Sequence, residues 1–256
     1  DSYAYTICQQ KGLNVITIPE KISLNCASKA LEKNATYTFK LTTSPTSASK
    51  SVTWRTGNSK VAKIDNNGKV TAVNAGNTYI YAKTPEGLEV KAKITVILPS
   101  ITKTNITVKN SMFTGSQIKP SITIKDGTKT LKNGTDYTVS YGKNTSLGKG
   151  TVKISGKGNY TGSISKTFTI SKRSVTTLSY GGLSARTYTG KAIKPSISVK
   201  YGKTTLKNGR DYTISYGKNI SPGKGSVKIS GKGNYTGTIT KTFTINKRSV
   251  STLSYN

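Results

Sequence analysis

Apolar and polar side chains alternate along short stretches throughout this chain. In residues 137–141, Tyr and Val alternate with Thr and Ser, and residues 152–154 and 168–170 repeat this alternation with Val, Ile and Phe. A period of two is typical of a β-strand that buries one face and exposes the other to water. Gly, Pro and Asn-Gly turns separate these stretches, and no segment carries the roughly 3.6-residue stripe of a helix. The pattern therefore predicts an all-β protein of short strands.

The second half of the chain contains a tandem repeat. Residues 113–175 match residues 188–250 at 47 of 63 positions, at an offset of 75. The longest shared run, Val152 to Gly162, recurs unchanged at Val227 to Gly237. A fixed period of this length indicates an array of similar units. About six or seven strands of ~5 residues would fit in each unit, which is enough for a small β-sandwich.

Both ends of the chain lead us to expect a segment of a longer array. Residues 251–255 repeat residues 176–180 with one substitution, so a further module is expected to begin there. The chain opens with Asp1 and shows no leader-like apolar region. No apolar stretch approaches the ~20 residues that span a bilayer, so we expect no membrane insertion.

The first hundred residues also read as strands, and they carry an ordered set of motifs. These motifs are Val-Thr-Trp at 52–54, Ser-Lys-Val-Ala-Lys-Ile-Asp at 59–65, Asn-Gly-Lys-Val-Thr-Ala-Val at 67–73 and Ala-Gly at 75–76. The set resembles the bacterial immunoglobulin-like (Ig-like) domain of group 2 over roughly residues 14–98. One departure is the Asn-Thr-Tyr-Ile-Tyr at 77–81, where that family often has a Gly-Thr-Ala-Thr-Ile type of strand.

The 75-residue units are similar to Ig-like modules found in tandem on large surface proteins of Gram-positive gut bacteria. The resemblance rests on Tyr-Thr-Gly-Lys-Ala-Ile-Lys-Pro at 188–195 and on Gly-Lys-Gly-Asn-Tyr-Thr-Gly at 156–162 and 231–237. It implies an exported, multi-domain and mostly non-catalytic protein, and it names no ligand.

Together these observations predict tandem immunoglobulin-like β-sandwich modules arranged as an elongated rod. The expected parts are an N-terminal strand or tail at 1–11, the bacterial Ig-like domain at 12–98, repeat 1 at 99–175, repeat 2 at 176–250 and the start of a truncated repeat at 251–256. Linkers of one or two residues near Pro99-Ser100 and Arg173-Ser174 predict a semi-rigid connection between modules.

Charge is the strongest functional signal. The chain holds 40 Lys and Arg against 9 Asp and Glu, a formal net charge of +31, and residues 100–256 alone carry 27 basic and 3 acidic side chains. Such a field favours polyanions, for example anionic cell-wall polymers or sulfated and sialylated glycans. Specific nucleic-acid binding is not expected, because no recognised binding motif accompanies the charge. The alternative, which we favour, is that evenly spaced lysines keep the array soluble and prevent strand edges from pairing.

The composition argues against an enzyme. With no His and only two Cys, histidine-based triads and the usual zinc sites are excluded, and we expect no catalytic residue, cofactor or metal. Only a carboxylate pair such as Asp65 with Glu86 or Glu89 would revive catalysis. Asp136 and Asp211 each follow an Asn-Gly turn, so we expect them to accept backbone N–H bonds there or to pair with a lysine. A less favoured alternative is that they promote a Lys–Asn isopeptide crosslink.

Two loops offer candidate ligand-binding residues: Lys157, Tyr160, Lys232 and Tyr235. The tyrosines would serve as stacking platforms for sugar rings, flanked by the lysines. A tyrosine near a strand turn in a sandwich more often folds inward, and we favour that interpretation. Trp54 is likewise expected to be a core aromatic residue and not a ligand platform.

Cys8 and Cys26 are the only cysteines. In an exported chain they are candidates for one disulfide, with free thiols or lost pairing partners as the alternatives. A catalytic role is not expected, because the chain has no histidine to serve as base.

The sequence therefore predicts a non-catalytic stalk or adhesion segment of a bacterial cell-surface or secreted protein. It would space the neighbouring domains of the same protein and contact polyanionic surfaces. The alternative is a set of carbohydrate-binding accessory modules that recognise host or dietary glycans.

Overall fold

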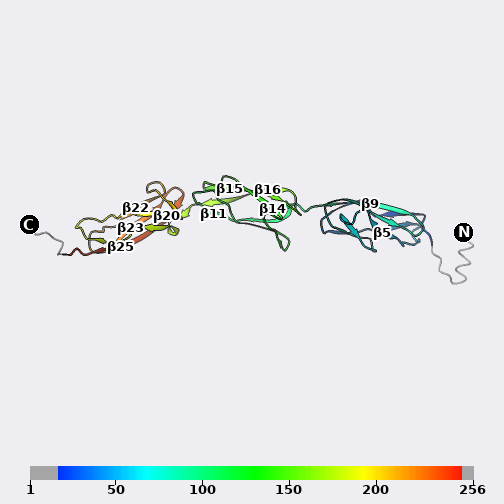
Figure 1. The fold of residues 1–256 in the computed structure, drawn as a ribbon, viewed down its shortest axis with the longest axis horizontal. Helices are drawn as coiled ribbons and strands as arrows, with labels where there is room; N and C mark the ends of the chain where they lie inside the picture. The colour runs from blue at the N-terminus through cyan, green and yellow to red at the C-terminus, as the bar shows by residue number, and fades with distance from the viewer. Residues whose placement is uncertain (1–16, 250–256) are drawn as a thin grey trace, which may run out of the picture. The chain divides into compact units, whose positions relative to one another are not determined.

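The computed structural model describes residues 17–249 and is built almost wholly from β-strands (Figure 1). Within these residues the helical elements are two short 3₁₀ turns, η1 (Ile101–Lys103) and η2 (Val175–Thr177). The predicted all-β class is confirmed. No helix in the described part of the chain is long and apolar enough to cross a membrane. The chain divides into unit 1, Asp1–Lys103 with Gly156–Gly162, and unit 2, Thr104–Ser155 with Ser163–Asn256.

Unit 1 is a sandwich of mainly antiparallel sheets. Its largest sheet has the order β2-β9-β8-β5, a second has the order β3-β7-β6, and β1 pairs with β4. The strands are β1 (Lys21–Leu24), β2 (Ser28–Glu32), β3 (Thr36–Thr38), β4 (Leu41–Ser44), β5 (Thr53–Thr56), β6 (Ala62–Ile64), β7 (Lys69–Ala72), β8 (Gly76–Lys83) and β9 (Glu89–Ile97). The pairing of β2 with β9 is parallel, and β8 pairs antiparallel with both β9 and β5.

Trp54 packs against the core of unit 1, as expected. Its ring stacks on Phe39 with centroids 6.4 Å apart and an interplanar angle of 28°. Gly68 makes room for it, because a Cβ at that position would lie 2.8 Å from Cζ2 of Trp54. Gly68 also has a φ of +76°, which side-chain-bearing residues rarely adopt. The Asn-Gly turn therefore serves the aromatic core as well as the chain reversal.

Unit 2 contains two successive sandwiches with matching strand orders. In repeat 1 the sheets run β10-β12-β13 and β11-β16-β15-β14, and in repeat 2 they run β18-β20-β21 and β19-β25-β23-β22. The strands of repeat 1 are β10 (Asn105–Val108), β11 (Ser111–Met112), β12 (Ile122–Asp126), β13 (Lys129–Thr130), β14 (Tyr137–Tyr141), β15 (Gly148–Gly156) and β16 (Ser163–Ser171). Those of repeat 2 are β18 (Ser179–Gly181), β19 (Arg186–Thr187), β20 (Ser198–Tyr201), β21 (Thr204–Thr205), β22 (Tyr212–Tyr216), β23 (Gly223–Gly231), β24 (Tyr235–Thr236) and β25 (Thr238–Asn246).

The alternation of apolar and polar residues places the apolar side chains in the core of the sandwich and the polar side chains at its surface. In β15, Val152 and Ile154 are buried while Lys153 between them is exposed, and β16 buries Phe168 and Ile170 in the same way. Gly150 lies where the sheet meets an aromatic ring, because a Cβ there would lie 2.5 Å from Phe168. No Lys or Arg in residues 17–249 is buried, so the basic side chains lie on the solvent-facing sides of the sheets.

A short linker strand joins the two repeats of unit 2. The strand β17 (Arg173–Ser174) pairs in parallel with β24, so that Arg173 is opposite Tyr235 and Ser174 is opposite Thr236. The N–H of Arg173 also donates to the carbonyl of Asn234 at 3.1 Å. The residues that leave repeat 1 are thus built into a loop of repeat 2.

Candidate functional site

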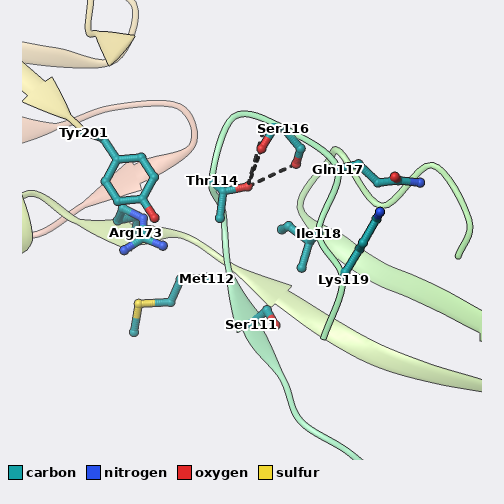
Figure 2. A pocket seen from close by; sticks show the side chains of 9 residues that line it. All are labelled: Ser111, Met112, Thr114, Ser116, Gln117, Ile118, Lys119, Arg173 and Tyr201. Carbon is teal, nitrogen blue, oxygen red and sulfur yellow. Dashed lines mark hydrogen bonds between the residues drawn. The ribbon is translucent and has the colours of Figure 1, made fainter. Parts of the chain in front are cut away.

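A hollow of about 600 Å³ lies in unit 2 beside this linker (Figure 2). Its lining residues are Ser111, Met112, Thr114, Ser116, Gln117, Ile118, Lys119, Arg173 and Tyr201. They come from β11, from the loop that follows it, from β17 and from the end of β20. The hollow therefore takes its lining from both repeats and from the linker between them.

Hydroxyl groups shape the loop after β11. Phe113 N–H donates to the carbonyl of Ser171 at 2.8 Å, which holds the start of the loop against β16. The hydroxyl of Thr114 donates to the carbonyl of Ser116 and accepts from the Ser116 N–H, at 3.1 and 3.3 Å. Figure 2 shows the two side chains turned toward one another at the rim of the hollow. The turn is a local side-chain-to-backbone motif of the kind that Ser and Thr favour.

Asn144 holds the far end of this loop through a buried hydrogen-bond network. Its Nδ2 donates to the carbonyls of Ile118 and Thr151 at 3.2 and 3.0 Å, and its Oδ1 accepts from the Thr151 N–H at 2.8 Å. The Ile118 N–H donates to the carbonyl of Asn144 at 3.1 Å. Asn144 has a φ of +47°, and Asn219 repeats the geometry in repeat 2 with the same angle. Asn suits this position because it tolerates the left-handed region and carries both donor and acceptor groups.

Arg173 connects the two sides of the hollow. Its Nε donates to the carbonyl of Phe113 at 2.7 Å, and its guanidinium lies 4.0 Å from the centroid of the Tyr201 ring. Figure 2 places the guanidinium between Tyr201 and Met112. A planar guanidinium both stacks on aromatic faces and donates in a fixed fork. Arg173 therefore fastens repeat 1 to repeat 2 and brings a positive charge into the hollow.

The hollow has the chemistry of a binding surface. It offers hydroxyls, one amide and the cations of Lys119 and Arg173, and none of its lining residues is Asp, Glu, Cys or His. Hydroxyls and cations can hold an anionic group. Residues 17–249 also contain no cluster of three or more His, Cys, Asp or Glu that would hold a metal ion.

The predicted loop residues separate into exposed lysines and buried tyrosines. Lys157 and Lys232 are exposed, whereas Tyr160 and Tyr235 retain 6% and 4% of their accessible surface. Tyr235 meets Phe113 edge to face with centroids 5.9 Å apart. Burial, reinforced by the Asp211 charge and opposed by the Arg173 charge, raises the pKa of Tyr235. The rings fold inward, as we favoured, and offer no face to a sugar. A ligand-binding role for this set stays a prediction that would have to rest on the lysines.

Asp136 and Asp211 accept backbone bonds, as expected. Oδ2 of Asp136 accepts from the N–H of Lys132 at 2.9 Å, and Oδ2 of Asp211 accepts from the N–H of Lys207 at 2.8 Å. The Arg210 guanidinium also binds Asp211 and lowers the pKa of that carboxyl, with burial acting in the opposite direction.

The alternative of a Lys–Asn isopeptide crosslink needs a buried lysine beside Asp136 or Asp211. The lysine that approaches Asp136 is Lys129, with 3.7 Å between the charged atoms, and its side chain is 56% exposed. The buried polar residues of the described part include no lysine. The crosslink needs a lysine buried beside the carboxylate and an asparagine, so the exposed position of Lys129 argues against it.

The acids considered for catalysis have structural partners. Asp65 accepts N–H bonds at 2.9 Å from the backbone of its own turn. Glu89 pairs with Arg55 at 3.0 Å, and Glu86 lies exposed in a turn. Their placement gives no support to a catalytic pair.

Cys26 is half-buried, and its Sγ lies 3.5 Å from the hydroxyl of Tyr37. Cys8 lies outside the described residues, so the disulfide stays a prediction.

Arg173 and Asn144 were not identified as site residues from the sequence. Both occur in copied motifs: Lys-Arg-Ser-Val at 172–175 and 247–250, and Tyr-Gly-Lys-Asn at 141–144 and 216–219. Duplication alone did not distinguish them from the many other copied residues.

A comparison against protein families found a match within unit 1. Residues 20–96 match the model of the bacterial Ig-like domain (group 2). This confirms the resemblance expected for roughly residues 14–98. A comparison with curated proteins found no match.

A comparison with solved structures also found matches. The N-terminal eight Ig domains of Down Syndrome Cell Adhesion Molecule have a TM-score of 0.31 and 11% identity over 93% of this chain and 37% of that one. Domains 4–9 of the surface layer protein SbsC have a TM-score of 0.28 and 12% identity over 91% and 51%. The extracellular domain of Protocadherin GammaB4 has a TM-score of 0.27 and 10% identity over 88% and 49%. The chain spans about half or less of these proteins, and similarity at this level carries no function across.

Proposed function

We propose that this chain is a non-catalytic stalk or adhesion segment of a bacterial cell-surface or secreted protein. Its Ig-like modules form a semi-rigid rod that spaces neighbouring domains, as in the Gram-positive surface arrays that the repeats resemble. Its positive field adds weak contacts to anionic cell-wall polymers or acidic glycans.

One observation carries the proposal: no Lys or Arg in residues 17–249 is buried, whereas the buried residues are mainly apolar. Residues 100–256 carry 27 basic and 3 acidic side chains, so these modules dominate the field. A field spread over whole sheets attracts polyanions without a specific pocket, and salt weakens it strongly.

The carbohydrate-binding alternative has support of its own in the hollow beside Arg173. Lys119, Arg173 and the hydroxyls of the loop at 114–116 line a concavity that suits one anionic group of an acidic saccharide. Tyr201 contributes an aromatic ring at its edge. In this alternative, affinity comes from one site and not from the field as a whole.

The test is binding of the chain to heparin, used as a sulfated polyanion probe, measured by isothermal titration at low and high salt. The screening length falls from about 10 Å at 0.1 M to about 3 Å at 1 M salt, so a diffuse field should lose at least roughly tenfold in affinity over this range. Heparin that fails to bind even at low salt would refute the adhesive part of the proposal.

Two lysine variants separate the diffuse field from the local site. Lys119→Gln removes a charge from the hollow, and Lys228→Gln removes one from the exposed face of β23. Equal small losses of heparin affinity in the two variants indicate the diffuse field. A much larger loss for Lys119→Gln, with binding that persists at 1 M salt, indicates the acidic-saccharide site instead.

A further inference from the structure

The surface from which the chain leaves repeat 1 recurs in repeat 2. We define the exit face of repeat 1 as Phe113, Thr114, Gly115, Lys172 and Arg173. At the offset of 75 its counterpart in repeat 2 is Tyr188, Thr189, Gly190, Lys247 and Arg248. Four of the five residues are identical, and the fifth changes one aromatic ring for another.

The backbone under the two exit faces is also the same. β11 runs parallel to β16, with Ser111 opposite Ile170, and β19 runs parallel to β25, with Arg186 opposite Ile245. Phe113 N–H donates to the carbonyl of Ser171 at 2.8 Å, and Tyr188 N–H donates to that of Asn246 at 2.9 Å. The second face is therefore a structural copy of the first as well as a sequence copy.

In repeat 1 this face is covered by repeat 2. Tyr235 of the loop Gly231–Gly237 packs edge to face on Phe113, and β17 pairs with β24 of the same loop. Phe113 is only 9% exposed as a result. In repeat 2, Tyr188 is partly exposed and lines a hollow of about 380 Å³ together with Thr189, Gly190, Pro222, Lys247 and Arg248.

The covering loop has a general role, because its other copy binds a linker too. In unit 1, Thr161 N–H of the loop Gly156–Gly162 donates to the carbonyl of Pro99 at 3.0 Å. The Ile101 N–H then donates to the carbonyl of Thr161 at 2.8 Å, and Ser100 is bridged in parallel to Thr161. In both cases the loop of a module receives the residues that enter that module.

We propose that the exit face of repeat 2 is a docking surface for a further copy of the same repeat. The Gly-Lys-Gly-Asn-Tyr-Thr-Gly loop of that copy packs its tyrosine edge-on against Tyr188, as Tyr235 packs on Phe113. Residues 248–249 pair with its Tyr-Thr dipeptide, as β17 pairs with β24. This deepens the proposed stalk function and rests on it, because docking of this kind sets the stiffness of an array.

The test extends the full chain by one repeat: residues 1–249 are followed directly by a second copy of residues 175–249. Amide hydrogen exchange is followed by NMR in the original and the extended chain. In repeat 2, Thr236 is paired with Ser174 of the linker. The corresponding threonine amide of the added copy should therefore exchange about as slowly as the Thr236 amide of repeat 2, since an amide inside a docked strand pair exchanges only through local opening.

Substitutions at Tyr188 assign the effect to the exit face. In the extended chain, Tyr188→Ala should abolish the protection of the added copy's threonine amide, whereas Tyr188→Phe should preserve it because repeat 1 carries Phe at this position. Tyr79→Ala, which removes a 41% exposed tyrosine from unit 1, is the matched control and should have no effect.

Two results would overturn the proposal. The first is an added repeat that folds while its threonine amide at this position exchanges at least about tenfold faster than the Thr236 amide of repeat 2. The second is an added repeat that stays unfolded, because the same sequence folds behind repeat 1. Neither result touches heparin binding, which is measured on the original chain, so failure of the docking surface and failure of the adhesive function remain distinguishable.

Discussion

Replacement of Asn144 by Ala should strongly destabilise repeat 1. The substitution leaves the Thr151 N–H and the Ile118 carbonyl without the partners that Asn144 provides. A buried polar group that loses its partner costs about 1–3 kcal/mol, and a left-handed backbone costs Ala roughly another 1 kcal/mol. We therefore expect a loss of about 3 kcal/mol or more, a large part of the ~5–15 kcal/mol that stabilises a typical domain.

Urea unfolding followed by two signals measures this loss. Far-ultraviolet circular dichroism reports the sheets of all modules, and Trp54 is the only tryptophan of the chain and lies in unit 1. Asn144→Ala should produce an earlier circular dichroism transition while the Trp54 fluorescence midpoint stays in place. Asn219→Ala removes the matching network of repeat 2 and should cost a similar amount.

Asn144→Gly separates the two contributions. Gly adopts a positive φ without strain, so this variant retains the loss of hydrogen bonds and removes most of the backbone cost. It should be about 1 kcal/mol more stable than Asn144→Ala. If Asn144→Ala lowers the stability of repeat 1 by less than about 1 kcal/mol, the Asn144 network does not hold the loop in place.

Two other substitutions test the packing and the charges of unit 2. Gly150→Ala places a Cβ about 2.5 Å from Phe168 and should cost about 1–3 kcal/mol through overpacking; an unchanged urea midpoint would contradict this. Asp211→Asn loses the ion pair with the exposed Arg210 and should cost about 1 kcal/mol or less at pH 7. Because the native pKa of Asp211 lies below its ordinary value of 3.8, that ion-pair stabilisation is present above pH 3.8 and fades as the pH falls through the native pKa. The difference between wild type and Asp211→Asn should therefore shrink in acid, and a gap that widens there would disprove the assignment.

Much of the fold could be predicted because one face of each strand is buried. The alternation around Val152 and Ile154 predicts which residues lie inside, and the structure buries both. The inward position of Tyr160 and Tyr235 followed from the preference of tyrosines near strand turns for the core. The Asn144 network could not be predicted, because it joins residues 7 and 26 positions apart in a loop that reads as a simple turn.

The amino-acid sequence by itself determined the strands, the 75-residue repeat and the cationic surface, because each depends on composition or on spacing between near neighbours. Only the tertiary structure decided what the copied residues do. Arg173 looks like a linker residue until β17 is paired with β24 and Tyr201 is placed under its guanidinium. Such contacts join residues from successive modules, and no pattern within one module specifies which of its surfaces the next one covers.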